Sequence, residues 1–186
     1  MKFLCAFLIL TSFSALARQY VPIEARTFEI RGTDALLHLE DSIQSPGEIL
    51  EIFQPAGGEI SRRVVRGNEI SFVATKRILF LSKSVRVHGI LDSQIRPDIC
   101  PSGEIGHQAI FDLSNSDAIL SDSYSVLEAN ICLKELTPTV VRGRVMGRLY
   151  LGNNYSRTLG PSIRDVVEAQ VPAFIKALES SVQKRQ

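Results

Sequence analysis

Apolar and polar residues alternate along most of the central part of the chain. This period of two predicts strands over residues 60–66, 70–74 and 78–91, and then over residues 109–113, 124–133 and 141–151. Residues 21–30, which include several β-forming side chains, predict one more strand before them. Strict alternation is typical of antiparallel strands that are covered on one face. The pattern therefore predicts an antiparallel meander.

The period changes between Gly32 and Gly57. Apolar residues recur there at helical spacing in two short stretches, and Pro46 separates the two. We expect two short helices in this part of the chain. A hairpin strand at residues 36–39 is the alternative.

A long amphipathic helix is predicted over residues 161–182. Pro161 suits the first helical position, and Pro172 is expected to kink the helix. The apolar stripe of this helix must be buried, and Gly143 and Gly147 offer a flat strand surface on which it can lie closely. The residues expected to face the sheet are Ile163, Val167, Phe174, Ile175 and Leu178.

The first 17 residues have the pattern of an export signal. Lys2 is the single charge, Phe3–Leu10 is an apolar run, and Ala15-Leu16-Ala17 closes the segment with small residues. A spanning helix needs about 20 mostly apolar residues, so this segment is short for a retained anchor, which is the alternative. We expect residues 1–17 to be a signal peptide and residues 18–186 to be a single domain, periplasmic or secreted.

Composition excludes some partners. The formal net charge is +1, so no overall field draws the chain to nucleic acid or to an anionic membrane surface. The sequence has no tryptophan and four tyrosines, which makes it a poor platform for base stacking. We therefore expect no nucleic-acid partner, and no stable membrane span once the leader is removed.

Two cysteines, Cys100 and Cys132, follow the predicted leader. In an oxidising compartment they allow one intramolecular pairing, and Cys100 lies in a loop rich in proline and glycine that a tether would hold. We expect a disulfide, which chain entropy makes worth about 3–4 kcal/mol. Two buried free thiols are the alternative.

One polar cluster is a candidate for chemistry. It consists of His88, Asp92, Asp98, Glu104 and His107. Imidazoles and carboxylates suit a divalent metal or acid–base catalysis, but their spacing over a strand and a loop matches no metal signature. Nucleotide-binding, zinc-protease and serine-hydrolase motifs are also absent. Loop-capping carboxylates and surface histidines are the simpler interpretation, and we expect no catalytic residue, metal or cofactor.

Two further groups of polar residues have a simple and a functional interpretation. Asp112, Asn115, Asp117 and Asp122 suggest calcium, but the central glycine and the spacing of an EF-hand are missing, so a solvated turn is preferred. The other group is an arginine row. Arg142, Arg144 and Arg148 can hold an anionic head group or form the solvent face of a strand, and the solvent face is preferred.

Asn154 begins a glycosylation sequon that matters only in a eukaryotic source.

The order of the predicted elements resembles the START-like, or helix-grip, superfamily. There, a first strand and two short helices precede a curved antiparallel sheet that wraps a long C-terminal helix. The resemblance spans Val21–Val182. It rests on element order and on the stretch from Val140-Val141-Arg142-Gly143 through Leu159-Gly160-Pro161 to the helix. It implies an α+β fold in which an antiparallel meander packs on a long C-terminal helix, with a mostly apolar cavity between them.

The resemblance implies that the chain binds a hydrophobic small molecule or lipid in that cavity. His88 shares a strand face with Phe80 and Ile90, so these three residues, together with Phe174, are the candidate ligand-binding residues. An interaction or structural module of the cell envelope, without enzymatic activity, is one alternative. Another is a metal-dependent or hydrolase-like enzyme that uses His88 and His107.

Overall fold

A computed structural model of the chain describes residues 19–55, 58–67, 69–78, 81–155, 157 and 159–186. The predicted signal peptide and Phe80 lie outside this part of the chain. The strands are β1 (Tyr20–Arg31), β2 (Gly58–Arg66), β3 (Glu69–Ile78), β4 (Leu81–Ile95), β5 (Ile105–Asp112), β6 (Tyr124–Thr137) and β7 (Val140–Leu151). The helices are α1 (Ala35–Gln44), α2 (Pro46–Ile52), α3 (Ala118–Ser123), α4 (Leu159–Glu168) and α5 (Val171–Lys184), with a 3₁₀ turn η1 (Pro97–Ile99).

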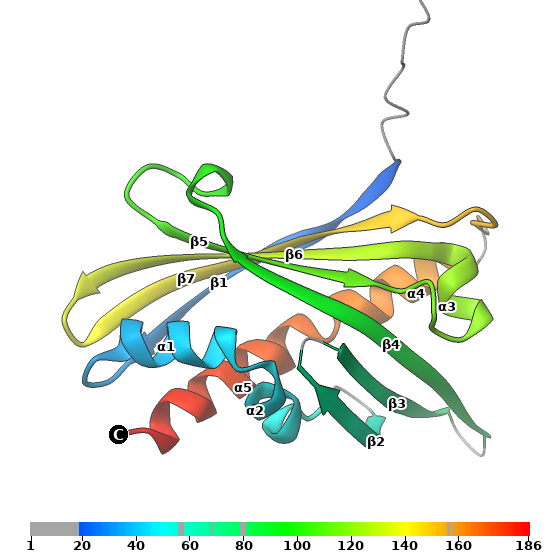
Figure 1. The fold of residues 1–186 in the computed structure, drawn as a ribbon, viewed down its shortest axis with the longest axis horizontal. Coiled ribbons are helices and arrows are strands. Elements are labelled where there is room, and N and C mark those ends of the chain that lie inside the picture. The colour runs from blue at the N-terminus through cyan, green and yellow to red at the C-terminus, as the bar shows by residue number, and fades with distance from the viewer. Residues whose placement is uncertain (1–18, 56–57, 68, 79–80, 156, 158) are drawn as a thin grey trace, which may run out of the picture.

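The described strands form one seven-stranded antiparallel sheet in the order β1-β7-β6-β5-β4-β3-β2. The meander runs from β2 to β7 by successive pairing, and β1 closes it by pairing with β7. Helices α1, α2, α4 and α5 lie on one face of the sheet, while the β4–β5 loop rises from the other face (Figure 1). Below, these are called the inner face and the outer face. This arrangement is the predicted α+β helix-grip architecture.

The two short helices are confirmed, and the hairpin alternative at residues 36–39 is wrong because these residues lie in α1. Pro46 stands in the first turn of α2, where its missing N–H costs nothing. The C-terminal helix is interrupted between α4 and α5 rather than only kinked. Pro172 lies in the first turn of α5, and it cannot continue an α-helix from α4 because it lacks an N–H and clashes with the preceding turn.

The atoms nearest to a Cβ at Gly143 or Gly147 would belong to neighbouring strands, not to a helix. A Cβ at position 143 would lie 2.0 Å from the Phe28 ring, and a Cβ at position 147 would lie 2.8 Å from the Glu128 carbonyl oxygen of β6 and 3.1 Å from Ile23. Phe28 is the direct partner of Gly143, and Ile23 of Gly147, in the β1–β7 ladder. The expectation that these glycines let the C-terminal helix approach closely is therefore wrong. They make room for two buried side chains of the neighbouring strand.

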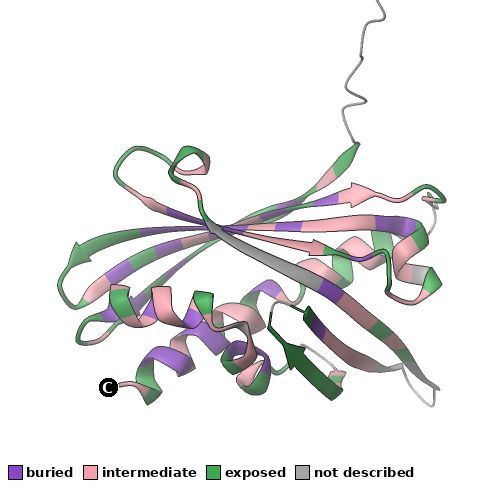
Figure 2. Ribbon diagram, in the orientation of Figure 1, coloured by how far each residue is buried: buried purple, intermediate pink, exposed green. Residues whose placement is uncertain are grey.

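A tightly buried part of the core lies where α5 packs on α1. Ala177, Leu178 and Val182 of α5 and Ala35 and Leu39 of α1 are all buried in one cluster. The hydroxyls of Ser42 and Ser181 form a buried hydrogen bond of 2.7 Å that joins the two helices. Burial is lower in α4, whose described side chains are intermediate or exposed (Figure 2). The helix layer is thus packed closely where α1 meets α5 and less closely at α4.

Candidate functional site

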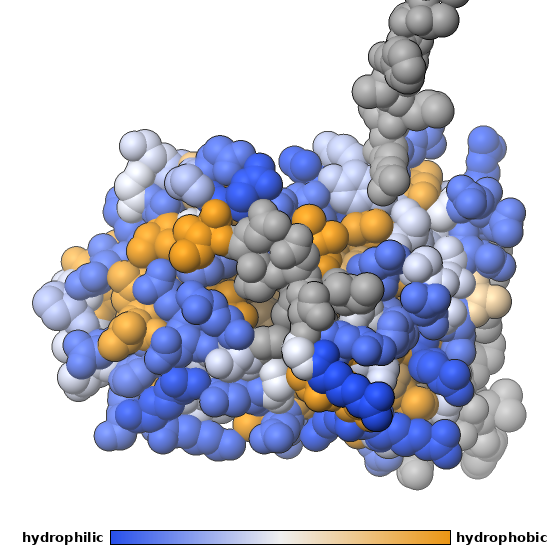
Figure 3. Space-filling model, in the orientation of Figure 1, coloured by the Kyte–Doolittle hydropathy of each residue, from blue (hydrophilic) through white to orange (hydrophobic). Residues whose placement is uncertain are grey.

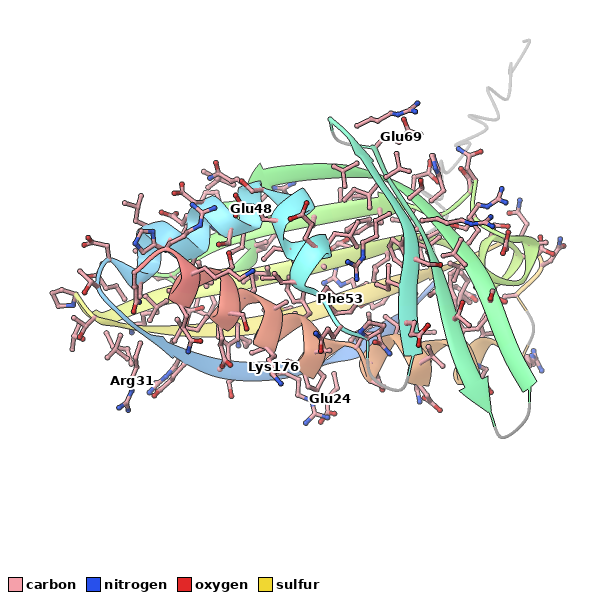
Figure 4. All side chains as sticks on the ribbon, turned by 90° about the horizontal axis from the view of Figure 1, so that it is seen from below. Glu24, Arg31, Glu48, Phe53, Glu69 and Lys176 are labelled. Carbon is pink, nitrogen blue, oxygen red and sulfur yellow. A yellow bond between two sulfur atoms is a disulfide. The ribbon has the colours of Figure 1, made fainter. Side chains whose placement is uncertain are left out.

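Several large apolar side chains contact the core but remain only half-buried. On the helices they are Ile163 and Val167 of α4 and Phe174 and Ile175 of α5. Around them are Ile52 and Phe53 at the end of α2, and Val87, Phe111 and Leu127 of β4, β5 and β6. We call these nine residues the half-buried apolar group. In the view from below, Phe53 lies near the middle of the helix-covered face (Figure 4).

The half-buried apolar group is unlike an ordinary core. Large apolar side chains that pack in a filled core lose nearly all contact with solvent, as Leu178 and Leu149 do here. In this group the side chains belong to the main cluster, yet each keeps part of its surface accessible. Accessible apolar walls contributed by both layers are what a hydrophobic ligand requires.

Of the four predicted ligand-binding residues, the structure describes the side chains of His88 and Phe174, and these two lie on opposite faces of the sheet. Phe174 belongs to the half-buried apolar group, whereas the side chain of Ile90, like Phe80, lies outside the described part of the chain. His88 lies on the outer face. Its neighbour Val87 contacts the core, and successive strand residues point to opposite faces. The Nε2 atom of His88 lies 3.6 Å from a carboxylate oxygen of Glu69.

His107 is the buried histidine of the predicted polar cluster. It lies on the inner face of β5 with 2% of its side chain exposed, and its Nε2 is 3.5 Å from Oε1 of Glu40 on α1. No hydrogen-bond partner reaches this Nε2 within the described part of the chain. Burial lowers the pKa of His107, and the nearby Glu40 carboxylate opposes this shift. The two histidines therefore lie on opposite faces, so the structure does not assemble the enzyme site that would use both.

The carboxylates of the predicted polar cluster are occupied on the outer face. Asp98 forms a 2.8 Å ion pair with Arg96, and Glu104 lies 3.7 Å from Arg144. The side chain of Asp92 is not among those described. These contacts fit the simpler interpretation, in which the carboxylates order the β4–β5 loop.

The predicted disulfide between Cys100 and Cys132 is present, with 5.7 Å between the Cα atoms. It ties the β4–β5 loop to the outer face of β6. Cys100, Glu104 and Cys132 are the one group among the described residues that is close enough to hold a metal. Because both cysteines are in the disulfide, their sulfur atoms are not thiolate ligands.

A buried polar network lies on the outer face, and the sequence did not predict it. Glu128 accepts hydrogen bonds from Asn130 Nδ2 at 2.9 Å and from the Tyr150 hydroxyl at 2.8 Å. Burial acts to raise the pKa of Glu128, but the hydrogen bonds from Asn130 and Tyr150 outweigh it, so the pKa is lowered. Gln108 is buried beside them and accepts a hydrogen bond from Arg96 at 3.3 Å. Alternation predicts strands covered on one face, yet these polar residues of the outer face are buried as well.

The arginine row is paired with carboxylates. Arg142 lies 3.0 Å from Glu29 and Arg148 lies 3.9 Å from Glu128, and the Arg144–Glu104 contact completes the row. Arg148 also stacks over the Tyr20 ring at 5.0 Å. Each arginine of the row therefore lies within 4 Å of a glutamate carboxylate on the outer face.

The predicted acidic turn has structural contacts. Asp117 Oδ2 accepts a 2.6 Å hydrogen bond from the Arg86 backbone N–H, and Asp112 Oδ1 accepts one of 2.9 Å from Ser114. Asp122 accepts a weak bond of 3.5 Å from Asn154. These contacts match the interpretation as a turn.

No helix in the described part of the chain is long and apolar enough to cross a membrane.

Solved structures share this fold. A protein from Thermus thermophilus aligns with a TM-score of 0.56 at 9% identity, over 89% of this chain and 99% of its own. A point mutant of norcoclaurine synthase from Thalictrum flavum, in complex with a transition-state analogue, aligns at 0.52 and 8% identity, over 90% of this chain and 98% of its own. A START superfamily protein from Mycobacterium smegmatis aligns at 0.47 and 14%, over 90% of this chain and 99% of its own.

The likenesses concern the fold alone, because all the identities are low. Together with the observed order of elements they confirm the START-like helix-grip fold predicted from the sequence. No protein-family model and no curated protein matches the sequence.

Proposed function

We propose that the chain binds a hydrophobic small molecule or lipid at the half-buried apolar group. The observation that carries this proposal is that large apolar side chains from the end of α2, from α4 and α5 and from three strands pack against one core cluster and keep part of their surface accessible. The norcoclaurine synthase structure, which has the same fold, holds a transition-state analogue, and a bound small molecule is in keeping with the proposal.

The proposal predicts a contrast between two adjacent valines. Val167 belongs to the half-buried apolar group, whereas Val166 is an exposed residue one position earlier in α4. Val167→Ala should weaken binding of the uncharged probe N-phenyl-1-naphthylamine several-fold, because it removes apolar contact area. Phe174→Ala should weaken it by about tenfold, since a larger side chain is lost. Val166→Ala is the matched control and should bind like the wild type. Probe fluorescence titrations measure all four proteins.

The proposed site would be wrong if Phe174→Ala and Val167→Ala both bound the probe with wild-type affinity. Native mass spectrometry of the purified protein then gives the natural ligand class. A co-purified apolar molecule that is absent from the Phe174→Ala protein is the result expected.

We further propose that the protein acts after export. Residues 1–17 have the pattern of a signal peptide, and a disulfide such as Cys100–Cys132 is typical of oxidising compartments. The mature chain should start at Arg18. N-terminal sequencing of the protein recovered from the periplasm or medium of a bacterial host tests this, and a chain that retains Met1 there would contradict it.

A further inference from the structure

The strands at the β2 edge of the sheet carry an excess of positive charge. Residues 58–86, which form β2, β3 and the first part of β4, contain seven lysines and arginines but two glutamates, a net charge of +5. The remaining residues between 18 and 186 contain 13 basic and 18 acidic residues, a net charge of −5. The near-neutral charge of the whole chain therefore conceals a separation of charge. We call residues 58–86 the basic arm.

The basic arm lies at an edge of the molecule. β2 is an edge strand, and each of its residues is exposed or only partly buried. In Figure 1, β2, β3 and the first part of β4 turn away from the other strands of the sheet. The surface over β2 is strongly hydrophilic, with hydrophobic residues beside it (Figure 3). The charges of the arm are therefore accessible to a partner.

The strand register places Val64, Arg66 and Arg86 together on the outer face. Their partners on β3 are at the alternate positions 71, 69 and 73, and position 71 also pairs with His88 of the outer face. Both arginines are exposed, and Val64 is 42% exposed. The partners of the two arginines are four residues apart, so the arginines lie about 14 Å apart along β3. This face thus combines spaced cations with an accessible apolar side chain.

The described arginines of the arm have no counter-charge. Among the described side chains, no ion pair involves any of them, namely Arg62, Arg63, Arg66 and Arg86. Glu69 of β3 lies 3.6 Å from His88, and Asp117 accepts a hydrogen bond from the backbone N–H of Arg86. The arginine row of β7, by contrast, is paired with glutamates throughout.

Protection of a sheet edge does not explain a single sign of charge. Charged residues on an edge strand discourage association between sheets, whichever sign they have. β1, the other edge strand, carries both signs. Its Glu24 is paired with Arg26, and its Glu29 is paired with Arg142. The excess of cations on the basic arm therefore indicates an anionic partner.

We propose that the basic arm docks on a membrane surface that contains anionic phospholipids. Each basic residue close to such a surface strengthens binding by about fivefold. Val64 supplies apolar contact at the boundary between headgroups and acyl chains. The negative charge of the remaining chain turns the rest of the molecule away from the membrane. A nucleic acid fits less well, because the arm has no tyrosine or tryptophan to stack on bases.

Vesicle co-sedimentation tests the proposal with residues 18–186, which include every described residue. Vesicles of equal parts phosphatidylglycerol and phosphatidylcholine are compared with vesicles of phosphatidylcholine alone. We expect the partition coefficient in 0.1 M NaCl to be at least tenfold higher for the anionic vesicles. In 1 M NaCl the screening length falls from about 10 Å to about 3 Å, and the difference should disappear. Equal binding to both kinds of vesicle, or binding to neither, would overturn the proposal.

Two matched variants test whether the arm is the docking surface. Arg66→Gln with Arg86→Gln should weaken binding to the anionic vesicles by about ten- to thirtyfold. The control is Arg31→Gln with Lys134→Gln, which removes the same charge at exposed positions outside the arm. Arg31 lies far from Glu69 of the arm (Figure 4). The control should bind within twofold of the wild type. An equal loss in both variants would show that only net charge matters, and would overturn the assignment to the arm.

Two further measurements identify the partner as a lipid surface. Val64→Ser should weaken binding to the anionic vesicles about two- to fivefold, because apolar contact is lost. Wild-type affinity in this variant would contradict contact with the acyl boundary. A DNA duplex of 20 base pairs, compared at equal phosphate concentration, should bind at least tenfold more weakly than the vesicles. Tighter binding of the DNA would assign the arm to nucleic acid and overturn the proposal.

The docking surface and the half-buried apolar group are tested separately. Arg66→Gln with Arg86→Gln should bind N-phenyl-1-naphthylamine like the wild type, and this result also shows that the variant is folded. Phe174→Ala should bind the anionic vesicles like the wild type, since Phe174 belongs to the half-buried apolar group. Loss of vesicle binding in Phe174→Ala would show that docking depends on the apolar site, and would overturn the assignment to the arm. Failure of the fluorescent probe alone affects only the apolar site.

Discussion

Leu178→Ala is expected to lower the free energy of unfolding by about 2–5 kcal/mol. Leu178 has no exposed surface and lies in the close-packed part of the core, where α5 crosses α1. Truncation there removes apolar contact and leaves a cavity that the surrounding helices and sheet cannot easily fill. Urea unfolding followed by circular dichroism measures the loss.

Two other residues of α5 serve as comparisons for Leu178. Phe174 is only half-buried, so Phe174→Ala should cost clearly less than Leu178→Ala although it removes more atoms. Lys176 is exposed, so Lys176→Ala should stay within about 0.5 kcal/mol of the wild type. Equal losses for Phe174→Ala and Leu178→Ala would mean that Phe174 is packed in a filled core, and the proposed ligand site would lose its main support.

Removal of the disulfide is expected to lower stability by about 3–4 kcal/mol, because the bridge joins positions 32 residues apart and restricts the unfolded chain. The test protein carries Cys100→Ser together with Cys132→Ala. Alanine is chosen at position 132 because that position is 1% exposed and a serine there would bury a hydroxyl. Urea unfolding of this protein and of the reduced wild type should agree. Ser102→Ala, an exposed change in the same loop, is the control and should have little effect.

A loss under about 1 kcal/mol would contradict the role assigned to the bridge. The loop would then be held chiefly by polar contacts such as Arg96 to Gln108 and Glu104 to Arg144. Removal of the disulfide should also loosen the structure locally, in the strands next to the loop. Gln108 and Asn130 are buried on the outer face near the tethered loop, so release of the loop should increase hydrogen exchange in β5 and β6.

The sequence predicted the order of elements because periodicity is a local property. Alternation identified the strands, Pro46 separated α1 from α2, and the apolar stripe identified the C-terminal helices. Periodicity also placed His88 on the strand face opposite Val87. It could not tell which face of β4 is covered by helices, because both carry apolar residues along that strand. The assignment of His88 to a cavity depended on that undetermined choice.

The polar parts of the structure were harder to predict because they depend on contacts between distant segments. Glu128 and Asn130 occupy alternate positions that resemble a solvent-facing strand, yet both are buried. His107 lies on an otherwise apolar face, and its neighbour Glu40 comes from a helix far earlier in the chain. The signal in the sequence for the buried His107–Glu40 pair was a polar residue at a core-facing position of β5.

The pairing of β1 with β7 also has a consequence for how the chain folds. Tyr20 lies opposite Tyr150, so the first strand of the domain finds its partner only after nearly all the other strands have been made. Contacts between such distant segments form slowly, because a long loop must close before they add stability. During synthesis the N-terminal strand therefore stays unpaired. For the export proposed above, this delay favours transit in an extended form, since the native sheet cannot close before β7 has been made.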